Sequence, residues 1–222
     1  MESKPKLYYF DAWARGEPIR LLLSHLKIEW EEEVIPLGPI KPEIKEKLEF
    51  GKVPMLEIDG MQLVESKSIL RYIALKHGLH PTDPVNNYKV NSLIDRYIDL
   101  ERTYYKIFFA KEEEKQEMRK EFVEKELFPT FTAIEKRLKE NSSQDHLVGD
   151  KLTLADVLYV DFIWSQAFNP TQSEEVMGRH KALFEKFPIL RAYAEKRKAD
   201  FPRFENREPK PIWPSILILK IL

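Results

Sequence analysis

The chain has 222 residues, a formal net charge of -1 and no cysteine, and 43% of its residues are hydrophobic. These values predict one large domain or two small ones with a packed core, and they lack the basic excess of a dedicated nucleic-acid binder. Without cysteine the chain forms no disulfide, thiolate metal site or cysteine nucleophile, so any sulfur chemistry must use the thiol of a substrate.

Both ends of the sequence bear on where the protein resides. Residues 1–5 are polar and contain no apolar signal core, and the longest apolar run, residues 216–219, is too short to span a bilayer. We therefore expect a cytoplasmic protein without a membrane span.

The first predicted element is a buried strand over residues 6–10. Successive side chains of a strand point to opposite faces, so Leu7 and Tyr9 share one face while Tyr8 and Phe10 share the other. Tyr9 is thereby separated from Tyr8, which we expect in the core.

The following segments complete a βαβ unit and then a ββα unit. Asp59-Gly60 is a strong two-residue hairpin signal between two short strands. Ser66 is placed to cap the last helix and Gly78 to end it. In chain order we expect a loop, a helix, a strand, a short irregular helix and two strands at residues 11–16, 18–26, 28–36, 39–48, 55–58 and 61–64.

Residues 80–84 are rich in proline and are predicted to be a linker, and the residues after them are predicted to be helical. A long helix carries an apolar stripe and a polar stripe, which are Leu93, Tyr97, Leu100, Tyr104 and Phe108 and then Asp95, Asp99, Arg102 and Lys106. A second long helix at 112–140 should bend at Pro129. Thr153 and Asp156 form a capping-box variant before a buried helix, and two helices fill residues 173–198.

This order of elements predicts an α/β N-terminal domain at residues 1–80 and an all-α C-terminal domain at residues 81–222. The first domain should contain a mixed four-stranded sheet covered by helices.

Five short motifs carry a family resemblance over nearly the whole chain. They are Leu7-Tyr8-Tyr9-Phe10, Arg15, Phe50-Gly51-Lys52-Val53-Pro54, Glu65-Ser66 and Leu152-Thr153-Leu154-Ala155-Asp156. Together they resemble the cytosolic glutathione transferases, and within them the sigma and alpha classes. The resemblance implies a thioredoxin-like first domain, a homodimer, glutathione as co-substrate and no metal. It also implies a detoxifying transferase that conjugates the glutathione thiolate to small hydrophobic electrophiles.

The same resemblance assigns roles near the thiol. The Tyr9 hydroxyl would donate to the glutathione sulfur and favour its thiolate, and Arg15 would add positive potential. A cis bond between Val53 and Pro54 would let the Val53 backbone pair with the cysteinyl residue. The plainer interpretations are a strand aromatic, an exposed loop arginine and an ordinary trans proline.

Further residues would hold the charged ends of glutathione. Ser66 at a helix N-terminus suits the γ-glutamyl carboxylate, and Glu65, which departs from the usual glutamine, can hold the ammonium. Lys45 and Lys52 would bind the glycyl carboxylate, and Asp99 would reach the glutathione of the partner subunit. Each of these charged side chains is otherwise a solvated surface residue.

An apolar electrophile pocket is expected to use five aromatic residues, although aromatics at helical spacing are more often core. They are Trp13, Tyr104, Tyr105, Phe108 and Trp213. The apolar tail after residue 213 can form a lid, as in alpha-class enzymes. The five histidines show no metal-site spacing.

Two alternative functions stay open at this point. One is a glutathione-dependent isomerase similar to prostaglandin D synthases, and the other is a ligand-binding or crystallin-like protein without activity. The sequence leaves the physiological electrophile and regulation undetermined.

Overall fold

The computed structural model describes residues 4–36 and 38–210. Trp213 and the predicted lid lie outside the described residues. The first part of the chain forms the mixed four-stranded sheet that the sequence predicts, in the order β2-β1-β3-β4. β2 is parallel to β1, whereas β3 is antiparallel to both β1 and β4. The strands are β1 (Lys6–Tyr9), β2 (Glu31–Val34), β3 (Met55–Ile58) and β4 (Met61–Val64).

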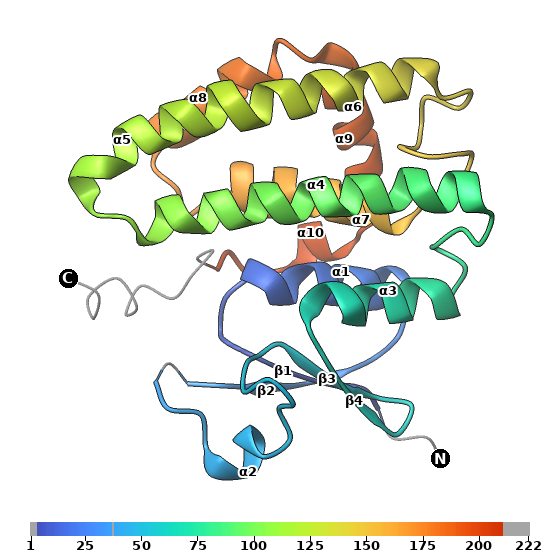
Figure 1. Ribbon diagram of the computed structural model, residues 1–222, viewed down its shortest axis with the longest axis vertical. Coiled ribbons are helices and arrows are strands. Elements are labelled where there is room, and N and C mark those ends of the chain that lie inside the picture. Colours follow the sequence, from blue (N-terminus) through green and yellow to red (C-terminus); the bar gives the residue numbers. More distant parts are fainter. Residues whose placement is uncertain (1–3, 37, 211–222) are drawn as a thin grey trace.

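Helices α1 (Glu17–His25) and α3 (Ser66–Lys76) cover one face of the sheet, and the short α2 (Pro42–Lys45) lies on the other side (Figure 1). Leu7 and Tyr9 belong to the large core beneath α1 and α3. Tyr8 packs in a smaller core that includes Ile35 and Leu48. The predicted alternation of side chains along β1 is therefore confirmed.

The hairpin between β3 and β4 turns at Asp59 and Gly60, whose φ angles of 54° and 74° are both positive. Positive φ at both central residues is the requirement of a tight two-residue hairpin turn, as predicted. The Asp59 carboxylate also accepts a hydrogen bond from Lys76 Nζ at 2.6 Å, which fixes the turn to the end of α3.

The two ends of α3 differ in how well they were predicted. The prediction that Ser66 caps the helix is wrong: Glu65 occupies the N-cap position with φ of 64°, and Ser66 is the first helical residue. The left-handed turn at Glu65 redirects the chain one residue earlier than a serine cap would. At the other end Gly78 has φ of 72°, and Leu79 N donates to Ala74 O at 2.8 Å, which confirms the glycine terminus.

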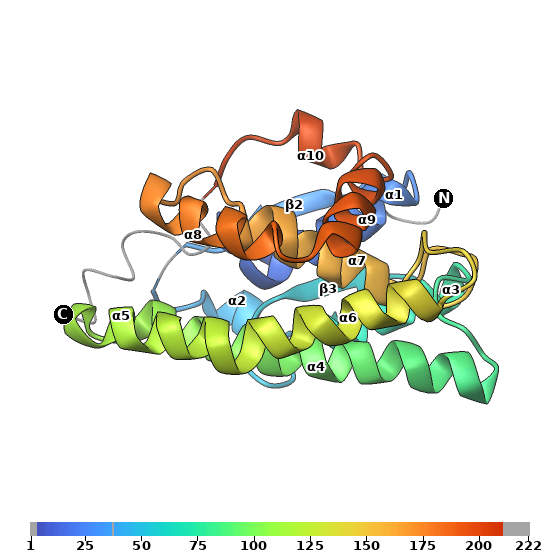
Figure 2. The same cartoon turned by 90° about the horizontal axis from the view of Figure 1, so that it is seen from above.

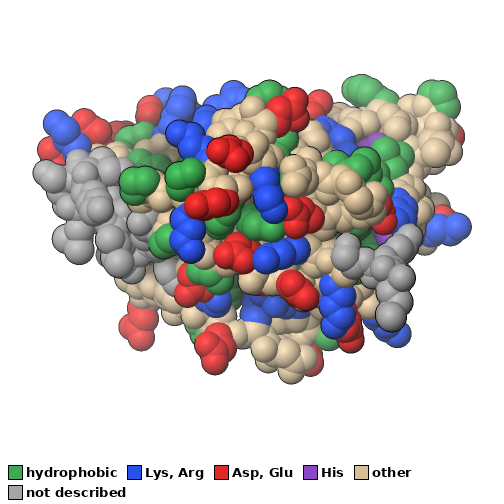
Figure 3. Space-filling view, turned by 90° about the horizontal axis from the view of Figure 1, so that it is seen from below, with side chains coloured by type: hydrophobic (Ala, Val, Ile, Leu, Met, Phe, Trp, Pro, Cys, Tyr) green, Lys and Arg blue, Asp and Glu red, His purple; other side chains and the backbone are tan. Residues whose placement is uncertain are grey.

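Most of the remaining described residues are helical, and these helices form the upper layer of the molecule (Figures 1 and 2). On the face seen from below, acidic and basic side chains are interspersed (Figure 3). The helices are α4 (Pro84–Phe109), α5 (Glu112–Glu121), α6 (Phe128–Glu140), α7 (Leu154–Asp161), α8 (Glu174–Phe184), α9 (Pro188–Lys198) and α10 (Arg203–Asn206).

Between α5 and α6 the chain stays helical as the π-helical stretch η2 (Phe122–Leu127), and Pro129 is the second residue of α6. Proline offers no N–H and crowds the carbonyl four residues earlier, so a wider turn accommodates it without ending the helix. A second π-helical stretch, η3 (Phe162–Ala167), extends α7.

Helix α7 is buried along its whole length, and Asp156 fixes its start. Asp156 Oδ2 accepts from the backbone N of Thr153 at 2.7 Å and from its hydroxyl at 2.8 Å, so the predicted cap is confirmed. Its Oδ1 accepts from Leu147 N at 2.9 Å and from the Tyr193 hydroxyl at 2.7 Å. One carboxylate thus joins the preceding loop, α7 and α9.

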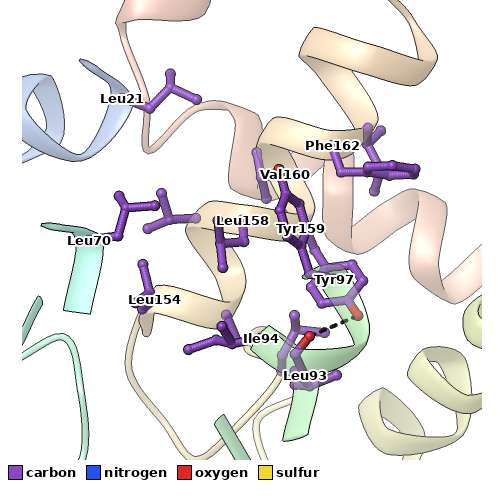
Figure 4. Packing of buried hydrophobic residues seen from close by; sticks show 14 of the residues in the cluster. Leu21, Leu70, Leu93, Ile94, Tyr97, Leu154, Leu158, Tyr159, Val160 and Phe162 are labelled. Carbon is purple, nitrogen blue, oxygen red and sulfur yellow. Dashed lines mark hydrogen bonds between the residues drawn. The ribbon is translucent and has the colours of Figure 1, made fainter. Parts of the chain in front are cut away.

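The layers meet in a continuous apolar core (Figure 4). Leu21 of α1 and Leu70 of α3 belong to the same core as Leu158 of α7 and Leu93 of α4. The buried Tyr159 hydroxyl is satisfied by donating to Leu93 O at 3.2 Å.

A buried carboxylate also joins the C-terminal segment to α1. Glu17, with no exposed surface, pairs with Arg203 Nε and Arg207 Nη1, each at 2.8 Å. Arg207 Nη1 lies 2.9 Å from Ser165 Oγ, whose hydroxyl donates to Asp161 Oδ1 at 2.6 Å. Lys210 pairs with Asp11 in the loop after β1.

This network predicts a pH dependence of stability. Burial raises the pKa of Asp161 from 3.8 to about 7, and among the described residues its Oδ2 has no hydrogen-bond partner. Between these pH values the folded chain holds a proton that the unfolded chain releases, so this carboxyl lowers the free energy of unfolding as pH rises from about 4 to 7. The effect is at most about 4 kcal/mol.

Asp161→Asn keeps an acceptor for Ser165 and removes the titration. We expect the variant to match the wild type in urea unfolding at pH 5 and to exceed it at pH 8. An equal difference at both pH values would show that Asp161 does not titrate in this range.

Candidate functional site

Tyr9 ends β1 with its side chain 1% exposed. Its hydroxyl oxygen accepts a hydrogen bond from the backbone N of Arg15 at 3.1 Å, which leaves its own proton free for donation. Burial raises the pKa of Tyr9, an effect that the N–H and the charge of Arg15 oppose. The phenol therefore stays protonated at neutral pH and acts as a hydrogen-bond donor.

The position of the Tyr9 ring depends on the turn after the loop. The turn is η1 (Ala14–Gly16), and Ala14 has a positive φ of 31°. A Cβ at Gly16 would lie 2.4 Å from Tyr9 Cδ1, so only glycine lets the backbone approach the ring this closely. The same close approach brings Arg15 N to the phenol.

Arg15 faces a buried carboxylate that was not predicted from the sequence. Glu101 of α4 is 4% exposed, and its two oxygens lie 3.3 Å from Arg15 Nε and 3.0 Å from Lys67 Nζ. The Arg15 guanidinium also lies 5.2 Å from the centre of the Tyr105 ring. Glu101 thus holds the loop after β1 and the start of α3 against α4.

A sequence signal for Glu101 does exist. It lies four residues after Tyr97 and four before Tyr105, and both of these are buried. Residues four apart share a helix face, so an acidic residue at this spacing is predicted to lie on the buried face.

The strand register brings three of the predicted glutathione residues, Val53, Pro54 and Glu65, to the end of the sheet where β1 ends. Tyr8 pairs with Met55 and Met55 with Val64. Val53 and Pro54 therefore precede β3 beside the end of β1, and Glu65 follows β4 at the same edge.

The individual features of this edge vary in burial. The Val53–Pro54 peptide bond is cis, as predicted. Ser66 is 6% exposed, whereas Lys45 and Lys52 are exposed. The three N–H groups that begin α3 have no earlier turn of that helix to pair with, which makes this end suited to an anion.

The structure divides the aromatic residues predicted for the electrophile pocket. Tyr105 lies beside Arg15, and Trp13 is 2% exposed with the Arg207 guanidinium 3.7 Å from its ring centre. Tyr104 and Phe108 instead line a separate cavity within the helical layer.

Asp99 lies on the exposed face of α4, where the sequence analysis placed it, with its carboxylate 3.6 Å from Arg102 Nη1. Across residues 4–36 and 38–210, no group of three or more His, Cys, Asp or Glu side chains is arranged to hold a metal ion. No helix in the part of the chain that the structure describes is long and apolar enough to cross a membrane.

Comparisons with known proteins agree with this geometry. Sequence models of the glutathione S-transferase N-terminal and C-terminal domains match residues 5–75 and 98–200. Human glutathione S-transferase A3 is 37% identical over 200 residues, which are 86% of this chain and 82% of that protein. Rat glutathione S-transferase alpha-5 is 36% identical over 198 residues, 86% of this chain and 83% of that protein.

Solved structures give the same result. The structure of NaGST-2 has a TM-score of 0.77 and 25% identity, and the match covers 94% of this chain and 98% of that one. That of prostaglandin synthase D of Nilaparvata lugens has a TM-score of 0.67 and 27% identity, covering 88% and 98% of the two chains. The chain belongs to the glutathione S-transferase family, whose co-substrate is glutathione.

The contact at Gly16 gives a direct test of how Tyr9 is positioned. Gly16→Ala should displace the Tyr9 ring, reduce transferase turnover and lower the free energy of unfolding by about 1–3 kcal/mol, since the buried ring has no free space to enter. Gly178→Ala is the matched control, because a Cβ there meets nothing within 4 Å and the site is a helix interior. Unchanged turnover in Gly16→Ala would contradict the contact.

The charge of Glu101 should also act on a bound thiol. Burial is the main cause that raises the pKa of Tyr9, and the negative charge of Glu101 raises it further. The same charge disfavours an anion, such as a thiolate, next to the Tyr9 hydroxyl. Glu101→Gln is expected to lower the pKa of bound glutathione by up to roughly one, as followed by thiolate absorbance. Asp95→Asn removes the same charge from the exposed face of α4 and should leave that pKa unchanged. A raised pKa in Glu101→Gln would refute this role.

Proposed function

We propose that this protein binds glutathione at the sheet edge around Tyr9 and conjugates its thiolate to small hydrophobic electrophiles. The observation that carries the proposal is the protonated, buried Tyr9 phenol, whose oxygen is already held by Arg15 N and whose proton is left for a sulfur acceptor. Arg15 adds positive charge beside it.

A hydrogen bond to the thiolate favours the charged form and lowers the thiol pKa. A fall from about 8.5 to about 6.5 raises the thiolate fraction at pH 7 roughly 25-fold. Nucleophilicity falls about 8-fold over the same change, so the net gain is roughly threefold. Placing the electrophile beside the sulfur must supply most of the remaining acceleration.

The rest of glutathione is assigned by charge and backbone pairing. The Val53 backbone pairs with the cysteinyl residue, and the start of α3 with Ser66 binds the γ-glutamyl carboxylate. The exposed carboxylate of Glu65 holds the adjacent ammonium. Lys45 and Lys52 hold the glycyl carboxylate as point charges.

We place the electrophile beside Arg15, against Tyr105 and Trp13.

The named relatives support an alpha-like class, while Asp99 and residues 42–45 favour sigma-like features. We further propose domain limits of 1–80 and 81–222 and a cytoplasmic location. Glutathione balance during turnover separates conjugation from the isomerase alternative, since isomerisation consumes no glutathione.

A homodimer is proposed because Asp99 is exposed where a second subunit would place its glutathione ammonium. Phe50 is 58% exposed, and burial of such a side chain against a partner is favourable. A sedimenting mass of one chain would contradict the dimer.

Tyr9→Phe tests the central role directly, because it removes the hydroxyl and keeps the ring. The pKa of bound glutathione should rise by about one to two, the worth of a hydrogen bond to a charged group. Turnover of a chlorinated nitroarene at pH 7 should fall at least about threefold, and the pH profile should shift upward. Tyr8→Phe, on the opposite face of β1, is the control. Equal pKa values and rates in Tyr9→Phe and wild type would overturn the assignment.

A further inference from the structure

The loop that carries Arg15 is also held by a segment from the other end of the chain. Helix α10 packs against α1, and the residues after it contact the chain on both sides of the turn η1 (Figure 1). Lys210 pairs with Asp11 at the start of the loop. Arg207 pairs with Glu17, the first residue of α1, across 2.8 Å.

The Arg207 guanidinium is buried among polar and aromatic groups, with its side chain 5% exposed. Its Nη1 donates to the Ser165 hydroxyl at 2.9 Å, and its Nη2 donates to Trp164 O at 3.3 Å. Its central carbon lies 3.7 Å from the centre of the Trp13 ring and 4.4 Å from that of Phe204. Because a guanidinium is planar, hydrogen bonds at its edge also fix the direction of the face that it presents to Trp13.

Trp13 connects this guanidinium to the turn behind Tyr9. It directly precedes η1, it is 2% exposed, and its carbonyl accepts from Glu17 N at 2.8 Å, which closes the turn. Inside the turn, Ala14 has a φ of 31°, a conformation that an alanine keeps only where its surroundings hold it. Displacement of Trp13 would therefore release the turn, and with it the N–H that Arg15 donates to the phenol.

The ion pair between Arg207 and Glu17 is shared with a second arginine. Without Arg207, the Glu17 carboxylate would keep Arg203 Nε at 2.8 Å. The Arg203 guanidinium, however, lies over the ring of Trp30, 5.9 Å from its centre. What distinguishes Arg207 is therefore its stack on Trp13.

We propose that Arg207 is a positioning residue of the site around Tyr9 and acts by stacking on Trp13. The stack keeps η1 closed, so that Arg15 N stays against the phenol oxygen. A hydroxyl that accepts a hydrogen bond is polarised into a better donor, so the closed turn strengthens the bond that Tyr9 offers to sulfur. The effect on sulfur rests on the proposed function, whereas the hold of Arg207 on the turn does not.

Hydrogen exchange of the Arg15 amide tests the turn in the full chain without glutathione. Arg207→Gln should lower the protection of this amide at least about tenfold, because an open turn exposes it to water. The amide of Leu79, which donates to Ala74 O at the end of α3, reports overall stability and should lose less protection. Unchanged exchange at Arg15, or equal losses at both amides, would overturn the proposal.

Two matched variants separate the stack from charge. Arg203→Gln removes a positive charge from Glu17 and should leave the ratio of the two amide protections unchanged. Arg207→Lys keeps the charge without the planar face and should not restore the protection of the Arg15 amide. Full protection in Arg207→Lys, or an equal loss in Arg203→Gln, would show that charge alone matters and would refute the stack.

A double variant shows whether Arg207 acts through Trp13. Trp13→Leu should lower the protection of the Arg15 amide by itself, and adding Arg207→Gln should cause no further loss. Losses that add would mean that Arg207 reaches the turn by another route, against the proposal.

A second measurement connects the turn to sulfur. In Arg207→Gln the pKa of bound glutathione should rise by at least about 0.5, while the affinity for S-methylglutathione, which lacks the thiol, stays within about twofold. An unchanged thiol pKa beside a less protected Arg15 amide would refute the effect on sulfur. An unshifted thiol pKa of about 8.5 in the wild type would instead refute the proposed function, and amide exchange would still decide the role of Arg207.

Discussion

The site depends on the buried Tyr9 hydroxyl, whose oxygen is held by a backbone hydrogen bond. A phenol with almost no exposed surface must find a hydrogen-bond partner, and Arg15 N supplies it. That N–H can reach the oxygen only because the backbone at Gly16 passes where a side chain would collide with the ring. The turn after β1 is therefore the element that makes Tyr9 a donor with its proton available, and the chemistry proposed here follows from that arrangement.

Two buried carboxylates then hold the helical layer against the same turn. Glu101 reaches Arg15 and Lys67 from α4, while Glu17 of α1 receives Arg203 and Arg207 from the C-terminal segment. Each carboxylate has at least two cationic partners, so replacing the carboxylate itself would leave these cations without their counter-charge, at a cost of about 3–5 kcal/mol for a buried pair. The two layers are therefore strongly restricted in relative position. Glu101 has an opposing effect on chemistry, because it neutralises part of the positive charge that Arg15 offers to a thiolate. Glu101 therefore fixes the position of Arg15 and at the same time reduces the positive potential at the thiolate position.

The sequence predicted the elements that rest on local chemistry. The hairpin at Asp59-Gly60, the glycine end of α3 and the cap at Asp156 each depend on a few neighbouring residues, and each is confirmed. The predicted start of α3 was wrong because Glu65, directly after β4, has a positive φ and occupies the N-cap position, which the preference of serine for helix caps does not report. The helical spacing of Glu101 indicates that it is buried, but its pairing with Arg15 and Lys67 comes from contacts with residues far away in the sequence. The role of Gly16 comes from its contact with Tyr9 across a turn.

The end of α4 explains why aromatic residues could not be assigned to one pocket from the sequence. Consecutive residues of a helix point about 100° apart, so Tyr104 and Tyr105 face different spaces although they are adjacent. Tyr105 and Glu101, four residues apart, face Arg15. Tyr104 and Phe108, also four apart, face the cavity beneath α8. A single apolar stripe predicts only that each aromatic ring is covered, whereas the helix separates two spaces, one beside Arg15 and one beneath α8.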